Sequence, residues 1–219
     1  MNPTPEKTSV MAPFILMLFL YFIVGLFTVI NQQFQVPLKS ALLPHDGNMT
    51  NALVTLLNFS WFLAYPFSEG FATRWVDRLG YRKTSVYSLL IFIAGLGFYE
   101  AAVLLHIYAP SYITIMGNPI FTGFFVFLSG SFVIGMAVTI LQVVTGLYLD
   151  VNPVGKTTPL QRQMIGGTTN SIGMAIGPLV VSYIIFYGIP LHNVQSREFI
   201  WPVICLIAII CIFTLITAR

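Results

Sequence analysis

The stretch Thr73–Thr84, TRWVDRLGYRKT, separates two long apolar runs with a concentration of charge. It holds four of the ten Lys and Arg residues of the chain, together with one Asp and one Gly. In multi-pass membrane proteins, an excess of Lys and Arg in short connections marks the cytoplasmic side. The stretch therefore predicts a cytoplasmic connection between two membrane-spanning helices.

The composition around this stretch is that of a membrane protein. The 219 residues are 57% apolar and only 8% charged, and the mean hydropathy is +0.85. A soluble domain carries about 25% charged residues, because its surface has to meet water. Lipid is therefore the solvent of this chain, and its net charge of +3 reflects membrane topology rather than nucleic-acid binding.

Six apolar runs are long enough to cross a hydrocarbon core, which takes about 20 helical residues. They cover residues 13–35, 52–72, 85–105, 121–147, 164–188 and 199–218. Continuous apolarity favours helices over barrel strands, which would alternate polar and apolar residues. We predict an all-α membrane protein with a short N-terminal tail (1–12) and one transmembrane domain of six helices (13–219).

The basic residues predict the orientation of this domain. With the N-terminus inside, the cytoplasmic side holds eight of them: Lys7, Arg74, Arg78, Arg82, Lys83, Lys156, Arg162 and Arg219. The opposite side holds only Lys39 and Arg197. This asymmetry predicts that both termini are cytoplasmic, in an inner (plasma) membrane.

The charged stretch also resembles a known loop signature. Asp77-Arg78-Leu79-Gly80-Tyr81-Arg82-Lys83 is similar to the G-x-x-x-D-R-x-G-R-R loop of the major facilitator superfamily, with Thr73 in place of the leading Gly. The resemblance implies a gating loop whose contacts break when the domain rocks. Its members here are Asp77, Arg78, Gly80, Arg82 and Lys83. The alternative is a plain positive-inside connection.

Two later segments and the first span resemble one family of that superfamily. The runs FLSGSFVIGM (127–136) and GGTTNSIG (166–173), with Gly25, Asn31-Gln32 and Pro37, are similar to the fucose and glucose/galactose permeases. The resemblance covers only the first half of such a permease. It implies half of a major facilitator fold, a 3+3 inverted repeat, that alternates access to a small neutral sugar together with a C-terminal six-helix half.

The chain departs from the proton-coupled members of that family at two acidic positions. The first-span Asp is replaced by Gln32, and the fourth-span Glu by Val138. Carboxylates inside a membrane are costly and are kept where protons are handled. A facilitator, a differently coupled carrier and a decayed copy therefore all stay open. Glu100, in the third span, is a candidate replacement proton site.

Neutral polar and aromatic residues in the spans suit a sugar, because amides pair with hydroxyls without charge. The candidate substrate-binding residues are Asn31, Gln32, Asn58, Trp61, Tyr65, Thr139, Gln142 and Asn170. The alternative is that such side chains hold helices together. Gly173 and Gly177 are spaced for close helix packing.

The motifs of common enzymes are missing from the sequence. It has no G-x-S-x-G, P-loop or H-E-x-x-H motif and no Cys/His metal spacing, and Cys205 and Cys211 are expected to be packing residues. We expect no catalysis, cofactor or metal. A non-transporting six-helix membrane protein, such as an assembly partner or sensor, and an inactive fragment are the alternatives to a transporter.

Overall fold

The computed structural model describes residues 11–43, 48–115 and 117–218. Residues 1–10 of the predicted tail and Arg219 lie outside the described residues. The α-helices are α1 (Met11–Gln33), α2 (Gln35–Leu42), α3 (Asn48–Tyr108), α4 (Gly123–Val151), α5 (Pro159–Leu179) and α6 (Ile200–Ala218). The shorter elements are β1 (Tyr112–Ile115), β2 (Asn118–Phe121), the π-helix η1 (Val180–Ile185) and the 3-10 turns η2 (Leu191–Asn193) and η3 (Ser196–Phe199).

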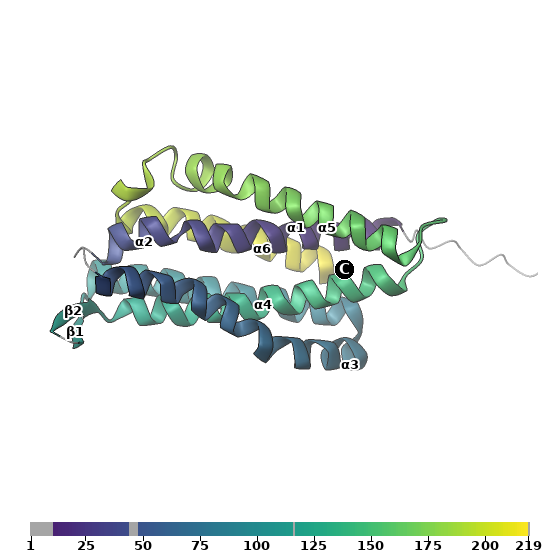
Figure 1. Cartoon of the computed structure of the whole chain (residues 1–219), viewed down its shortest axis with the longest axis horizontal. Coiled ribbons are helices and arrows are strands. Elements are labelled where there is room, and N and C mark those ends of the chain that lie inside the picture. The colour runs from purple at the N-terminus through teal and green to yellow at the C-terminus, as the bar shows by residue number, and fades with distance from the viewer. Residues whose placement is uncertain (1–10, 44–47, 116, 219) are drawn as a thin grey trace, which may run out of the picture.

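Long apolar helices make up most of this structure, which confirms the prediction of an all-α membrane protein. Within the described residues, five helices are long and apolar enough to cross a membrane. The longest, α3, has two arms that run in opposite directions along the long axis of the molecule (Figure 1).

The charged stretch that was predicted as a connection is almost entirely helical. The helix α3 is broken only at Gly80, whose φ of 78° and ψ of 169° lie outside the helical region. A positive φ carries no steric cost for glycine, so the chain can reverse at this one residue. Helical geometry therefore continues past the predicted span ends at residues 72 and 85, and the connection is shorter than the sequence pattern indicated.

The first span also differs from its predicted end. It breaks at Phe34 and continues as the separate helix α2. Pro37 explains the break, because its ring clashes with the carbonyl four residues earlier, on Gln33.

The fourth span begins after a short hairpin that the hydropathy pattern did not indicate. Strands β1 and β2 pair antiparallel, with Tyr112 opposite Phe121. Gly117, with a φ of 80°, lies in the connection. Aromatic and β-branched residues favour strands, so Phe121 belongs to β2 and the helix starts at Gly123.

Two close helix pairs organise the bundle: α3 with α4, and α1 with α5. The second pair depends on glycine. A Cβ on Gly173 would overlap the carbonyl oxygen of Phe22, and one on Gly25 would overlap that of Asn170. Gly177 lies against Val29 in the same way. The prediction that Gly173 and Gly177 let the fifth span approach a neighbour closely is confirmed.

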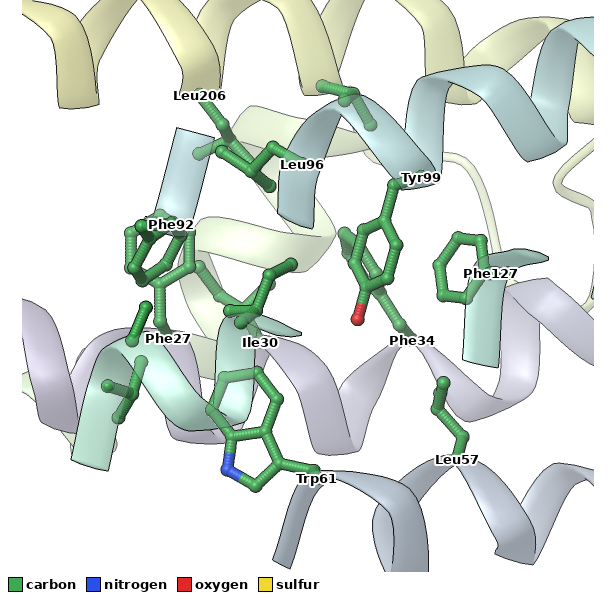
Figure 2. Close-up of a cluster of buried hydrophobic side chains, with 14 of the residues drawn as sticks. Phe27, Ile30, Phe34, Leu57, Trp61, Phe92, Leu96, Tyr99, Phe127 and Leu206 are labelled. Carbon is green, nitrogen blue, oxygen red and sulfur yellow. The ribbon is translucent and has the colours of Figure 1, made fainter. Parts of the chain in front are cut away.

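Aromatic side chains fill the space where α1, α3, α4 and α6 meet (Figure 2). The rings of Tyr99 and Phe127 stack with centroids 3.7 Å apart, and those of Phe27 and Phe92 meet edge to face at 4.6 Å. Pairs with this geometry contribute about 0.5–1.5 kcal/mol each beyond the area they bury. The core is therefore well packed beside the polar residues described next.

Candidate functional site

A cluster of uncharged polar side chains surrounds Asn31 near the end of α1. Its amide oxygen accepts hydrogen bonds from the Tyr99 hydroxyl (3.1 Å) and the Ser131 hydroxyl (3.2 Å). Its amide nitrogen donates to Oδ1 of Asn58 at 3.4 Å. We call these four residues the Asn31 cluster. It joins α1 to both arms of α3 and to α4.

Three members of the Asn31 cluster are closed to solvent in this conformation, and the fourth, Asn58, is half-buried. Asn31 is 2% exposed, and Tyr99 and Ser131 are buried as well. The Ser131 oxygen also lies 3.1 Å from the carbonyl of Leu57, so the Ser131 hydroxyl can donate its one hydrogen to either Asn31 or Leu57. A buried amide with its hydrogen bonds satisfied holds helices together, as the alternative interpretation of these residues expected.

A second polar group lies around Tyr65, on the first arm of α3. Its half-buried hydroxyl lies close to the side chains of Trp61 and Thr28. Trp61 is 1% exposed, and its indole nitrogen has no hydrogen-bond partner. Thr28 donates to the carbonyl of Val24 within α1. The Tyr65 hydroxyl and the Trp61 indole are thus neighbouring polar groups, and the indole N–H has no hydrogen-bond acceptor.

The two predicted amides Gln32 and Gln142 lie at different depths. Gln142 follows Ser131 by eleven residues of α4, which is about 16 Å of helix. Ser131 contacts Asn31, next to Gln32, so Gln142 lies roughly that far from the level of Gln32. Gln32 is exposed near the end of α1 and Gln142 is half-buried. The two amides therefore lie on opposite sides of the middle of α4.

The remaining predicted contacts already have partners within the chain. Thr139 is 1% exposed and donates to the carbonyl of Gly135 in its own helix at 2.8 Å. Asn170 is half-buried and donates to the carbonyl of Tyr21 at 2.9 Å, which links α5 to α1. The structure therefore brings together Asn31 with Asn58, and Trp61 with Tyr65, and places Thr139 and Asn170 apart from them.

Glu100, the candidate proton site, is half-buried in the second arm of α3. Its Oε2 atom is buried and has no hydrogen-bond partner. His106, six residues further along, instead has its Nδ1 atom 2.8 Å from the Ser196 hydroxyl. That hydroxyl also lies 3.0 Å from the carbonyl of Ala41, and together these contacts tie α2, α3 and η3 at one end of the bundle.

The predicted gating loop surrounds the break at Gly80. Asp77, Arg78 and Lys83 are exposed. Arg82 donates to the carbonyl oxygens of Thr217 (3.3 Å) and Ala218 near the end of α6. A cation at a helix C-terminus satisfies carbonyls that have no partner within the helix. Arg82 thus connects the turn in α3 to α6.

The most completely bonded charge of the described chain is Arg162, which the sequence pattern marked only as cytoplasmic. It is 3% exposed. Its guanidinium donates to the carbonyls of Leu149 (2.6 Å), Asp150 (2.8 Å) and Thr157 (2.8 Å). Two of these acceptors lie in the last turn of α4, so Arg162 fastens α5 to the end of α4.

The sequence analysis did not predict that four of these residues make contacts between or within helices: Thr28, Tyr99, Ser131 and Arg162. Tyr99 offered one signal, a polar tip within an apolar run, and Ser131 lies inside the Gly-rich run 127–136. Their partners are 68 and 100 positions away in the chain, respectively, and sequence spacing does not reveal such pairs.

Of three comparisons with known proteins, the one with solved structures supports the fold. No protein-family model and no curated protein matches this sequence. Among solved structures, the inward-open xylose transporter XylE from Escherichia coli is similar, with a TM-score of 0.66 and 15% sequence identity. The similarity covers 95% of this chain and 46% of that transporter, so the chain spans less than half its length. The chain is an integral membrane protein with the fold of one half of a major facilitator transporter.

Proposed function

We propose that this chain is the N-terminal half of a permease that moves a small neutral sugar, a hexose or deoxyhexose, by alternating access with a C-terminal six-helix half. One observation carries the proposal: a half-transporter fold in which the polar side chains gathered around Asn31 and Tyr65 are uncharged. Hydroxyls, amides and an indole N–H exchange hydrogen bonds with sugar hydroxyls without a charge to balance. The related fold of XylE, described as a xylose transporter, supports the same substrate class.

The sugar site that we propose lies near the middle of the helices. Substrate sites of such transporters lie close to the bilayer midplane. Gln142 is five residues from the central residue of α4, Ala137, and Ser131, which marks the level of Asn31 and Gln32, is six residues from it on the other side. Gln142 is half-buried, whereas Gln32 is exposed. We therefore propose Tyr65, Trp61 and Gln142 as the midplane contacts and the exposed Gln32 as a contact at the entrance.

The polar residues that already bond to another helix or to their own helix have a supporting role in this proposal. Asn31 and Asn58 hold α1 and the first arm of α3 in place through their mutual hydrogen bond. Asn170 holds α5 against α1. Thr139 lies beside Val138, the position where proton-coupled relatives carry an acid, and both are buried. We propose that transport follows the sugar gradient and is independent of protons.

The gating role of the charged turn is part of the same proposal. Arg82 is bonded to the end of α6, and the exposed Asp77, Arg78 and Lys83 are free to contact another half of the transporter. When the two halves rock, contacts of Asp77 and its neighbours form and break on the cytoplasmic side.

Uptake into vesicles tests the function. The chain and the half that completes it are reconstituted into proteoliposomes, and entry of labelled hexoses and deoxyhexoses is measured with and without a pH gradient. We expect saturable uptake that the pH gradient does not change. If there is no uptake but the chain still folds, the assembly-partner or sensor alternative replaces the transporter. Uptake that rises with an inward proton gradient and is lost in Glu100→Gln assigns coupling to Glu100.

Three variants test the position of the site. Gln142→Ala and Tyr65→Phe each remove a proposed hydrogen bond to the sugar at the midplane, and Gln32→Ala removes an amide near the helix end. Loss of one neutral hydrogen bond costs about 0.5–1.5 kcal/mol, or roughly 2- to 13-fold in apparent affinity. We expect that loss for Gln142→Ala and Tyr65→Phe, and a smaller one for Gln32→Ala. The reverse order would place the site at the end of α1.

A further inference from the structure

An apolar groove runs between α1, η1 and α6. Its volume is about 270 Å³. It is lined almost entirely by apolar side chains, among them Phe22, Leu26 and Ile30 of α1, Ile184 of η1, and Cys205 and Ile209 of α6. All these elements belong to segments long and apolar enough to cross a membrane.

The backbone explains why the groove is open. The main contacts of α5 are with α1, through Gly173 and Gly177, while those of α6 are with α3. Beyond Pro178 the α-helical geometry is lost, and the chain continues as the π-helix η1. It then reverses at Tyr187 (φ 51°) and Gly188 (φ 78°). Since α5 and α6 are fastened to different partners, their side chains do not close the space over α1.

The rim of the groove faces outward from the bundle. Ile184 is 66% exposed, Ile209 is 45% exposed and Cys205 is also exposed. In a membrane, the medium at such a rim is the hydrocarbon of lipid chains. Water does not fill the groove, because apolar walls offer it no hydrogen bonds. A protein cavity of about 150 Å³ with such walls stays dry and binds benzene.

From this geometry we infer that the groove holds one acyl chain of a bilayer phospholipid as a retained ligand. The acyl chain enters the groove at the end marked by Tyr187 and Trp201, which are 76% and 69% exposed. Tyr and Trp at helix ends lie at the level of lipid headgroups. The acyl chain packs between η1 and α6, against side chains such as Ile184 and Ile209. None of the proposed sugar contacts lines the groove, so lipid binding there does not depend on sugar transport.

Photocrosslinking in vesicles tests the inference. The full chain is reconstituted in phosphatidylcholine that carries a diazirine in its acyl chain, and labelled residues are mapped by mass spectrometry. Leu215 is the comparison, because it is 67% exposed on α6 and lies outside the groove. If the groove retains an acyl chain, Ile209 is labelled several-fold more than Leu215, although the side chain of Ile209 is less exposed than that of Leu215. Equal labelling, or labelling in the order of exposure, overturns the inference.

A matched pair of variants separates the groove from the general lipid surface. Ile209→Trp fills the groove, while Ile212→Trp adds the same bulk at a 55% exposed position of the same helix outside it. The excess labelling of Cys205 and Ile184 is lost in the first variant and kept in the second. Loss in both, or in neither, contradicts a groove-bound chain. No labelling in the groove of the unaltered chain means that protein covers it, and also refutes the inference. The comparison within the unaltered chain decides the matter even if a variant does not fold.

Discussion

The buried arginine at the start of α5 offers the sharpest test of how the bundle is held together. Arg162→Met keeps most of the apolar stem of the side chain and removes its donors. Three carbonyls then lose a donor, at 2.6 Å for Leu149 and at 2.8 Å for Asp150 and Thr157. We expect a large loss of stability, because Leu149 is fully buried and water cannot replace the donor there.

The size of this loss follows from the exposure of each acceptor. A hydrogen bond to a charged group contributes about 1.5–3 kcal/mol, and an unsatisfied buried acceptor costs about 1–3 kcal/mol. The Leu149 carbonyl is expected to show the full effect, whereas the exposed Asp150 recovers part of it from water. The favourable interaction of the cation with the C-terminal end of α4 is lost as well, at about 0.3–1 kcal/mol. We therefore expect Arg162→Met to lower the free energy of unfolding by about 3–5 kcal/mol.

Denaturant unfolding of the purified chain in detergent micelles, followed by circular dichroism, measures this free energy. Lys156→Met is the matched control, because Lys156 is an exposed cation of the same connection. It should change stability by less than about 0.5 kcal/mol. Arg162→Lys keeps the charge but lacks the fork of donors, so its loss should be intermediate. Equal stability of Arg162→Met and Lys156→Met would refute the role assigned to the guanidinium.

Three further variants test the packing and polar contacts by the same measurement. Asn31→Leu should cost about 1–3 kcal/mol, because it removes the acceptor of the Tyr99 hydroxyl and the donor to Asn58, although Ser131 can still donate to the carbonyl of Leu57. Gln32→Leu at the exposed neighbouring position should be near neutral. Equal effects of the two substitutions would show that the hydrogen bonds of Asn31 do not matter. Gly173→Ala should be strongly destabilising, since the new methyl group overlaps the carbonyl oxygen of Phe22 in α1. Gly167→Ala adds a methyl group in open space and should be neutral or slightly stabilising. A neutral Gly173→Ala would mean that α5 and α1 can move apart without loss of stability. Arg82→Met should cost about 0.3–1 kcal/mol, since this arginine is exposed at the end of α6, and a loss as large as that of the buried arginine would contradict the burial argument.

The helix ends show where hydropathy is informative and where it is not. Apolar runs locate segments that cross hydrocarbon, and the long helices indeed contain them. The runs do not reveal where helical geometry stops, because a helix that leaves the membrane can continue with charged residues. This is why the stretch from Thr73 to Thr84 is helical except at Gly80. The glycine was visible in the sequence, but its positive φ depends on how the two arms of α3 pack.

The polar residues show a similar division. Their presence in the spans was plain from the sequence and favoured a neutral substrate. Their partners were not, because the side chain that meets Asn31 depends on the rotation of α3 and α4 about their axes. That rotation is set by close contacts such as those of Gly95 with Ile134 and of Gly135 with Trp61. Existing hydrogen bonds then separate supporting residues such as Asn31 from candidate sugar contacts such as Trp61, whose indole nitrogen has no partner.

The sequence by itself determined that this chain lives in a membrane, since 8% charged residues cannot cover a water-exposed surface. It also determined that the spans are helical, because hydrocarbon leaves an isolated backbone no other way to satisfy its hydrogen bonds. Only the tertiary structure decided that Arg162 fastens two helices, that Asn31 is buried among its partners, and that a groove remains between η1 and α6. Those features depend on how the helices pack against one another, which the order of residues along the chain does not reveal.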